Sequence, residues 1–419
     1  MRVSGRIAVP GDKSISHRAL ILGALASGTS RVRGVLQSAD VRSTAEALRA
    51  MGAGVPALAS TFAIDGRGRR GLCAPASALD CGNSGTSARL LAGVVAGHPI
   101  SARFEGDASL SVRPMRRVAT PLARMGAAIE LERGDGLPMT VRGGDLCALE
   151  WQSEIASAQV KSAILLAALT SGVTAGVSEP ERSRDHTERM LASMGAPVTV
   201  ADLRVQLDPV ARLEPLELDV PGDPSSAAFF VALAALATTG ELCIERVCLN
   251  PTRTGFFRAV GAMGARVDVI DEAVGGGEPI GSLVARPAHL RAIHLAPDGV
   301  ASLIDEIPLL ACLAARAEGT TVITGAGELR VKESDRIAVV IENLRELGVD
   351  AEELPDGMRI TGSDRPLRGR VRTHGDHRIA MAFGILGADP SCRIDLDDRE
   401  CVGVSYPRFW EDLGRVVSR

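Results

Sequence analysis

Apolar residues recur at helical spacing in six Ala- and Leu-rich runs, and each run opens on a polar loop. Ser, Asn and Asp at such openings are typical helix N-caps, because their side chains accept hydrogen bonds from free backbone N–H groups. The spacing therefore predicts a buried helix in each run, followed by a short strand. The runs are DKSISHRALILGALASGTSRV, NSGTSARLLAGVVAG, SAQVKSAILLAALTSGVTAGV, DPSSAAFFVALAALATTGELCI, SLIDEIPLLACLAARAEGTTVI and DHRIAMAFGILGADPSCRI.

A second helix followed by a strand recurs between these runs. It is clearest in ALRAMGAGV, PLARMGAAIEL, MLASMGAPVTV and AVGAMGARVDVI, looser in NLRELGVDAEEL, and a remnant in DLGRVVS. We expect the glycine of each copy to end its helix in left-handed geometry, which costs glycine little. Six units with two helices and several strands each indicate an α/β protein. These glycines are Gly52, Gly126, Gly195, Gly264, Gly348 and Gly414.

Two identical tetrapeptides divide the repeats into two sets of three. Val-Pro-Gly-Asp occurs at 9–12 and again at 220–223. Pro-Gly favours a turn and interrupts regular structure, so both segments are expected to be hinges. The predicted first domain spans 12–221. The second would combine 1–11, as an N-terminal strand, with 222–419, and residues near both hinges would lie in a cleft between the domains.

Composition narrows the class of protein. Of 419 residues, 46% are apolar, but the longest wholly apolar run, 227–237, is much shorter than the roughly 18–20 residues of a membrane helix. The N-terminus has no apolar stretch typical of a secretory signal. A net charge of −4 and 3% aromatic residues argue against a nucleic-acid partner. The eight cysteines include no CxxC pair. We therefore expect a cytoplasmic protein with reduced thiols and no membrane association.

The first helix opening carries candidate anion-binding residues. Gly11-Asp12-Lys13-Ser14 resembles a phosphate loop, but Asp12 stands where a Walker A motif needs glycine, so nucleoside triphosphate binding is rejected. Lys13, Ser14 and Arg18 lie in the first turns of a helix, where backbone N–H groups favour an anion. A solvated helix start is the alternative for this segment alone.

Cationic residues recur at equivalent openings and in other loops. Each alone is consistent with a surface charge. Together, if the repeats direct them to one cleft, they indicate a substrate with more than one anionic group. At openings these residues are Arg89, Lys161 and Arg378, and elsewhere they are Arg113, Arg184, Lys332 and Arg336.

Acidic residues provide candidates for proton transfer. Asp305-Glu306 precede Pro308 and could be ordinary helix-start residues, while Glu333 lies three residues before Arg336 and could form only an ion pair. The alternative is general acid/base chemistry beside a lysine. His374 and His377 alone make a weak metal site, so no metal is expected.

A set of motifs resembles one family over most of the chain. From residue 9 to about 380 the matches run in order, and together they resemble the 5-enolpyruvylshikimate-3-phosphate synthases, in the form of their more divergent bacterial branch. The motifs are PGDKSISHRAL, GNSGT, GDASLSVRPM, SAQVKSA, RDHTE, VPGDPSSAAF, NPTRTG, IDEIPLLA, ELRVKESDR and DHRIAMAF.

The resemblance implies two inside-out α/β domains, each of three βαβαββ units. It also implies transfer of the enolpyruvyl group of phosphoenolpyruvate to the 5-hydroxyl of shikimate 3-phosphate, with release of phosphate and without a cofactor. A monomer is expected. The implied ligands of shikimate 3-phosphate are Lys13, Ser14, Arg18, Ser157, Ala158, Gln159, Arg184, Asp305 and Lys332. Those of phosphoenolpyruvate are Lys13, Asn83, Gly85, Arg113, Gln159, Arg336 and Arg378.

The resemblance also assigns catalytic roles. Asp305 would accept the proton of the 5-hydroxyl, and Glu333 with Lys13 would handle protonation of the methylene carbon. One departure concerns phosphoenolpyruvate, because Val404 stands where many members have a lysine. Two other functions remain as alternatives. One is a UDP-N-acetylglucosamine enolpyruvyl transferase, although the GDASLSVRP loop lacks the cysteine typical of that enzyme, and the other is a non-catalytic repeat scaffold.

Overall fold

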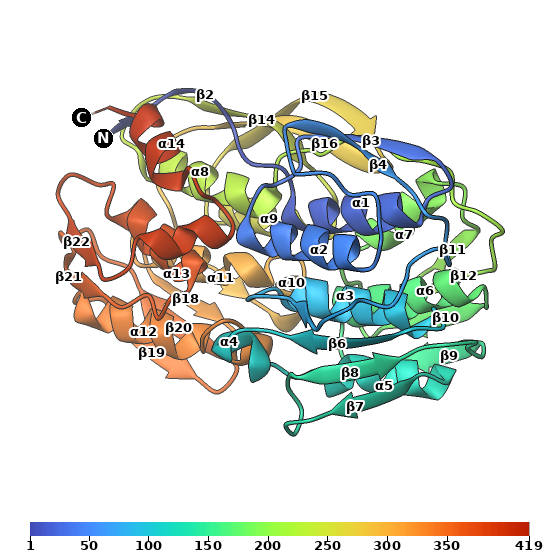
Figure 1. Cartoon of the computed structure of the whole chain (residues 1–419). Coiled ribbons are helices and arrows are strands. Elements are labelled where there is room, and N and C mark those ends of the chain that lie inside the picture. Colours follow the sequence, from blue (N-terminus) through green and yellow to red (C-terminus); the bar gives the residue numbers. More distant parts are fainter. Residues whose placement is uncertain (419) are drawn as a thin grey trace. The chain divides into compact units, whose positions relative to one another are not determined.

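The computed structural model describes residues 1–418, and the chain forms two compact units (Figure 1). The N-terminal unit comprises 11–220 and the short segment 274–278, and the C-terminal unit comprises 1–10, 221–273 and the chain from 279 onward. The chain therefore passes between units within both Val-Pro-Gly-Asp segments. It also does so at 273/274 and 278/279, which the repeat pattern did not indicate.

The N-terminal unit alternates helices and strands in the order expected for βαβαββ repeats. Its elements are α1 (Lys13–Leu25), β3 (Thr29–Arg33), α2 (Ala39–Ala50), β4 (Thr61–Asp65), β5 (Leu79–Asp80), α3 (Gly85–Ala96), β6 (Ser101–Glu105), α4 (Ala108–Ser111), α5 (Arg116–Met125), β7 (Ala128–Leu131), β8 (Met139–Arg142), β9 (Leu149–Gln152), α6 (Ala158–Ser171), β10 (Ala175–Ser178), α7 (His186–Ser193), β11 (Val198–Ala201), β12 (Arg204–Leu207) and β13 (Glu217–Asp219).

The C-terminal unit repeats this order after two N-terminal strands. Its elements are β1 (Arg2–Val3), β2 (Gly5–Ala8), α8 (Pro224–Leu236), β14 (Leu242–Cys248), α9 (Gly255–Ala262), β15 (Val267–Gly275), β16 (Glu278–Ala285), β17 (His294–Leu295), α10 (Pro297–Val300), the 3₁₀ turn η1 (Ile304–Glu306), α11 (Ile307–Ala314), β18 (Thr320–Ile323), η2 (Gly327–Val331), α12 (Arg336–Glu346), β19 (Asp350–Leu354), β20 (Gly357–Thr361), β21 (Arg368–Val371), α13 (His377–Leu386), β22 (Arg393–Leu396), η3 (Glu400–Val404), α14 (Phe409–Val416) and β23 (Val417–Ser418).

Among the described residues, four of the six repeats have a four-stranded sheet, the first has the three-stranded sheet β13-β3-β4, and the last has the two-stranded sheet β21-β22. In the third repeat β9 and β10 are parallel, β12 is antiparallel to β10, and β11 closes the order β11-β12-β10-β9. Two strands are exchanged at the unit boundaries: β2 pairs parallel with β14 in the C-terminal unit, while β13 pairs parallel with β3 in the N-terminal unit. The strand that opens each set of repeats thus completes a sheet of the other set.

Buried helices form the inside of each unit and half-exposed sheets lie outside. Residues of α1, α3 and α6 are buried on nearly all sides, and α3 contacts both α1 and α6. The α3–α6 approach needs glycine, because a Cβ at Gly93 would lie 2.2 Å from the carbonyl oxygen of Ala163. Strands such as β3 alternate exposed and buried residues. The expected α/β fold with helices inside is confirmed.

Helix limits follow the predicted capping residues. Asp12, Ser84, Ser157, Asp223 and Asp376 each accept a hydrogen bond from a backbone N–H of the helix that they precede. All but one of the repeated glycines have positive φ, as predicted. The prediction for Gly414 is wrong, because this residue lies inside α14, and the helix continues directly into β23.

Among the described residues, no helix combines the length and the apolar character that crossing a membrane requires.

Candidate functional site

The candidate residues of the N-terminal unit gather at the starts of its three buried helices. Asp12 caps α1 through the backbone N–H of Ile15 (2.8 Å). Lys13, the first residue of α1, forms an ion pair with the buried carboxylate of Asp40 on α2. Ser14 is half-buried beside it. This start of α1 thus presents an ammonium group whose position is fixed by a carboxylate that the sequence analysis did not single out.

Arg18 is held rigidly one turn further along α1. Its guanidinium donates to Thr187 Oγ1 on α7 (2.6 Å), to Ser162 Oγ on α6 (2.8 Å) and to the carbonyl oxygen of Ser14 (3.0 Å). Burial lowers the pKa of Arg18 to about 10, so the group stays charged at neutral pH. Arg184, half-buried in the loop before α7, lies close enough to lower this pKa further.

The GNSGT loop and the Arg113 loop meet at the start of α3. The Arg113 guanidinium donates to the side-chain oxygen of Asn83 (2.6 Å) and to its backbone carbonyl (3.2 Å). Asn83 in turn donates to Asp107 (2.7 Å). Two residues expected to hold phosphoenolpyruvate are therefore brought together.

Gln159, at the start of α6, joins this group through α3. Its side-chain oxygen accepts from Arg89 (2.6 Å), and its amide nitrogen donates to Thr86 (3.0 Å), which follows Gly85. Arg89 also donates to the carbonyl oxygen of Pro114 (3.0 Å). Arg89 therefore orients Gln159, which is a different role from the substrate contact considered for it from sequence.

Lys161 differs most from its expected role. Its ammonium binds Glu179 (2.7 Å) and Glu188 (2.8 Å), and all three side chains are about 5% exposed or less. Burial lowers the pKa of Lys161, but the two carboxylates outweigh it, so the net pKa is raised. Lys161 is a buried ion-pair residue, and the hypothesis that it faces an anionic substrate is wrong. The helical spacing placed Lys161 at the start of a helix, but it could not show that two carboxylates bind the ammonium group in the folded protein.

The C-terminal unit holds the other candidates around Asp305 in η1. The Asp305 carboxylate lies 3.5 Å from Lys332 Nζ, 3.5 Å from a nitrogen of Arg336 and 3.7 Å from one of Arg378. The last guanidinium also contacts Glu306 (3.2 Å). Asp305 is thus an acceptor surrounded by three cations, more than an ordinary helix-start residue has.

Arg336 is the most enclosed group of this cluster. It is 1% exposed and binds Glu333 (2.6 Å) and Asp376 (2.8 Å). Burial lowers its pKa, but Asp376 and Glu333 outweigh this effect and the net pKa is raised. The sequence predicted Asp376 only as the cap of a helix and did not indicate that its carboxylate binds Arg336.

Three further positions complete the comparison with the expected site. Ser157 caps α6 through the backbone N–H of Val160 (3.5 Å), and Ala158 is the first residue of the helix. Val404 ends η3. The expected residues are divided between the two units, and each unit contributes several cations. In the N-terminal unit Arg18 and Arg113 are held by hydroxyl, amide and carbonyl oxygens, whereas in the C-terminal unit the cations lie around Asp305.

A sequence model of EPSP synthase (3-phosphoshikimate 1-carboxyvinyltransferase) matches residues 1–413. The chain belongs to the EPSP synthase family. It is 47% identical to the 3-phosphoshikimate 1-carboxyvinyltransferase of Sulfurihydrogenibium sp. (strain YO3AOP1) over 99% of this chain and 97% of the relative. It is 49% identical to the enzyme of the same name from Alkalilimnicola ehrlichii, over 99% and 94% of the two chains.

A solved structure supports the same family. The EPSP synthase from Acinetobacter baumannii has a TM-score of 0.87 and 42% identity to this chain, covering 99% of this chain and 96% of the other. The family expected from the motifs is thereby confirmed, as is the enolpyruvyl transferase fold.

Proposed function

We propose that this chain transfers the enolpyruvyl group of phosphoenolpyruvate to the 5-hydroxyl of shikimate 3-phosphate and releases phosphate. Membership of the EPSP synthase family over residues 1–413 is the observation that carries this proposal. The cations of both units support it, because both substrates are polyanions. The relatives from Sulfurihydrogenibium sp. and Alkalilimnicola ehrlichii, both named for this activity, favour it over the UDP-N-acetylglucosamine enzyme and the non-catalytic scaffold.

The N-terminal unit would bind most of both substrates. Lys13, Ser14, Arg18 and Arg184 would contact shikimate 3-phosphate, with Ser157, Ala158 and Gln159 at the start of α6. Backbone N–H groups at a helix start favour a phosphate, and the fixed guanidinium of Arg18 adds charge without a large entropy cost. Lys13 and Gln159, together with Asn83, Gly85 and Arg113, would hold phosphoenolpyruvate.

The C-terminal unit would supply Asp305 and Glu333, two of the three groups proposed to move protons. We propose that Asp305 accepts the proton of the 5-hydroxyl group of shikimate 3-phosphate, while Lys332 orients this substrate. The three cations around Asp305 hold its carboxylate in place, and a general base must lie within hydrogen-bond reach of the proton that it accepts. Arg336 and Arg378 would bind phosphoenolpyruvate.

The proposed chemistry proceeds through addition and elimination. Glu333 with Lys13 would protonate the methylene carbon, and the hydroxyl would attack the central carbon to give a tetrahedral intermediate. Loss of phosphate, together with return of one proton from the new methyl group to Glu333 and Lys13, would restore the double bond. Glu333 is bonded to Arg336 in this structure, so phosphoenolpyruvate and Glu333 would have to share that guanidinium. Fixed cations stabilise the charge that develops, and no cofactor enters the scheme.

A phosphate-release assay with purified full-length protein tests the proposal. We expect release that requires both phosphoenolpyruvate and shikimate 3-phosphate, and none when UDP-N-acetylglucosamine replaces the acceptor. Release only with UDP-N-acetylglucosamine would favour the sister activity, and no release with either would favour a binding scaffold. A cytoplasmic location and a monomeric state stay predictions, and sedimentation can measure the second.

Asp305→Asn tests the role of the general base. We expect kcat to fall roughly 100- to 10,000-fold, because the amide keeps the shape of the side chain but cannot accept the proton. Binding of shikimate 3-phosphate, measured by calorimetry, should persist. Asp298→Asn, an exposed aspartate in α10, is the matched control and should leave kcat unchanged. Normal turnover in Asp305→Asn would contradict this role.

A further inference from the structure

A buried carboxylate joins two loops of the N-terminal unit that the proposed function assigns to the phosphate of shikimate 3-phosphate. Glu179 follows β10, and its side chain is 4% exposed. One carboxylate oxygen accepts the backbone N–H of Ser157 (2.9 Å). The other accepts from Lys161 (2.7 Å) and from the hydroxyl of Ser183 (2.8 Å). Glu179 therefore connects the residue that caps α6 with the residue next to Arg184.

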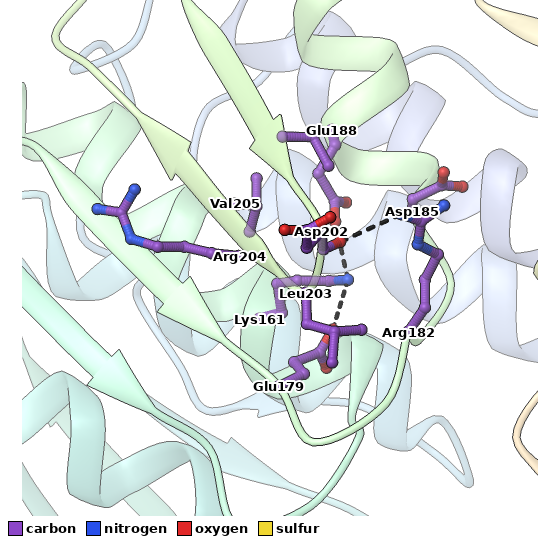
Figure 2. Close-up of a pocket in the computed structure, with 10 residues that line it drawn as sticks. Lys161, Glu179, Arg182, Asp185, Glu188, Asp202, Leu203, Arg204 and Val205 are labelled. Carbon is purple, nitrogen blue, oxygen red and sulfur yellow. Dashed lines mark hydrogen bonds and ion pairs between the residues drawn. The ribbon is translucent and has the colours of Figure 1, made fainter. Parts of the chain in front are cut away.

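Lys161 holds the carboxylate of Glu179 in place. Its ammonium binds Glu179 and also Glu188 on α7, so it joins α6, the end of β10 and α7 (Figure 2). Next to Glu188, Thr187 bonds the guanidinium of Arg18. The three buried charges thus join the elements that carry Arg18, Ser157 and Arg184, which makes them a common support for a phosphate site.

In this network one ammonium group faces two carboxylates, so its net charge is negative and does not attract an anionic substrate. Lys161 binds two carboxylates and lines a pocket together with Glu179, Arg182 and Glu188 (Figure 2). Arg182 in the wall of this pocket donates to the carbonyl oxygen of Asp202 (3.1 Å). A ligand at Lys161 would have to replace buried ion pairs, which is unfavourable. The network is therefore suited to positioning residues, and not to binding substrate itself.

We propose that Glu179 is a positioning residue that sets the separation of Ser157 and Arg184 and thereby makes the enzyme selective for a phosphorylated acceptor. This inference rests on the proposed function. Both carboxylate oxygens of Glu179 accept hydrogen bonds, whereas glutamine at this position has only one oxygen that can accept them. If its single oxygen faces Ser157, its NH₂ faces the ammonium of Lys161, which can only donate, and Ser183 has to accept instead of donate. In the reverse orientation the NH₂ faces the N–H of Ser157, which is also a donor.

Glu179→Gln is the test, with full-length enzyme and both substrates. We expect the KM for shikimate 3-phosphate to rise about 10- to 100-fold, the range expected for loss of a hydrogen bond to a charged group. The KM for phosphoenolpyruvate and kcat at saturation should change less than threefold. The preference for shikimate 3-phosphate over unphosphorylated shikimate, as a ratio of kcat/KM, should fall by the same 10- to 100-fold. A purely structural role would lower the amount of active enzyme without changing this ratio.

Asp202→Asn is the matched control, because it makes the same chemical change in the same pocket at an exposed side chain. We expect wild-type constants for it. Ser183→Ala removes one hydrogen bond to Glu179 and is the alternative test if Glu179→Gln does not fold. We expect this variant to raise the KM for shikimate 3-phosphate about threefold to tenfold. An unchanged acceptor preference in the folded variants would overturn the inference. Inactive wild-type enzyme would instead overturn the proposed function, so the two failures are distinguishable.

Discussion

At the start of α3, the absence of a side chain at Gly85 leaves room for the guanidinium of Arg89. A Cβ on Gly85 would lie 2.8 Å from a terminal nitrogen of Arg89, too close for the present arrangement. That nitrogen is the one that donates to Gln159. A methyl group at position 85 therefore acts first on a protein residue that orients Gln159, and only then on a ligand.

For Gly85→Ala we expect the KM for phosphoenolpyruvate to rise roughly tenfold, since a misplaced Gln159 loses one hydrogen bond to a charged ligand. Steady-state kinetics with both substrates provide the measurement. Gly144→Ala, where a Cβ meets no atom within 4 Å, is the control. An unchanged KM for phosphoenolpyruvate would contradict this prediction, because it would show that Arg89 moves while Gln159 stays in place.

At the scale of single elements, Asp376 ties the start of α13 to the start of α12. It accepts from the backbone N–H of Arg378 (2.9 Å), from Ser334 (3.0 Å) and from Arg336 (2.8 Å). Burial raises the pKa of Asp376, but Arg336 outweighs this effect and the net pKa lies below the ordinary 3.8. The folded state is therefore stabilised by the ionised carboxylate.

Asp376→Asn should lower the free energy of unfolding by about 3 kcal/mol at pH 7, because it leaves a buried guanidinium less compensated. A carboxyl group whose pKa is lower in the folded than in the unfolded protein stabilises the folded state at pH values above its unfolded pKa. This stabilisation is lost as the pH falls below 3.8 toward the pKa of the folded state. Urea unfolding of wild type and variant from pH 7 to pH 3 should thus show a difference that shrinks in acid. A constant difference across this range would contradict a charge-based role.

At the scale of the whole molecule, the proposed acceptor ligands belong to both units. Arg18 and Gln159 are in the N-terminal unit, and Asp305 and Lys332 are in the C-terminal unit. We therefore expect shikimate 3-phosphate to draw the two units together about the segments 9–12 and 220–223. Small-angle scattering should give a smaller radius of gyration at saturating ligand. An identical profile with and without ligand would argue against a hinge at these segments.

The repeats of this chain were readable because their signals are local. A capping residue and the helical spacing that follows it depend on residues a few positions apart, so Ser157 and the start of α6 could be predicted directly. Left-handed glycines such as Gly126 follow from backbone sterics alone. Gly414 was misjudged because α14 runs straight into β23, which pairs with β1 at the other end of the sequence.

By itself, then, the sequence determined the fold class, the six repeats, the family and the residue types of the proposed site. Tertiary structure decided which of the cations are available to a ligand. Lys161 and Arg89 have the same pattern in sequence as Lys13, yet one is neutralised by Glu179 and Glu188 and the other orients Gln159. The physical reason is that the charge environment of a side chain depends on partners distant in sequence, and only folding brings a carboxylate from β10 or α7 to an ammonium group on α6.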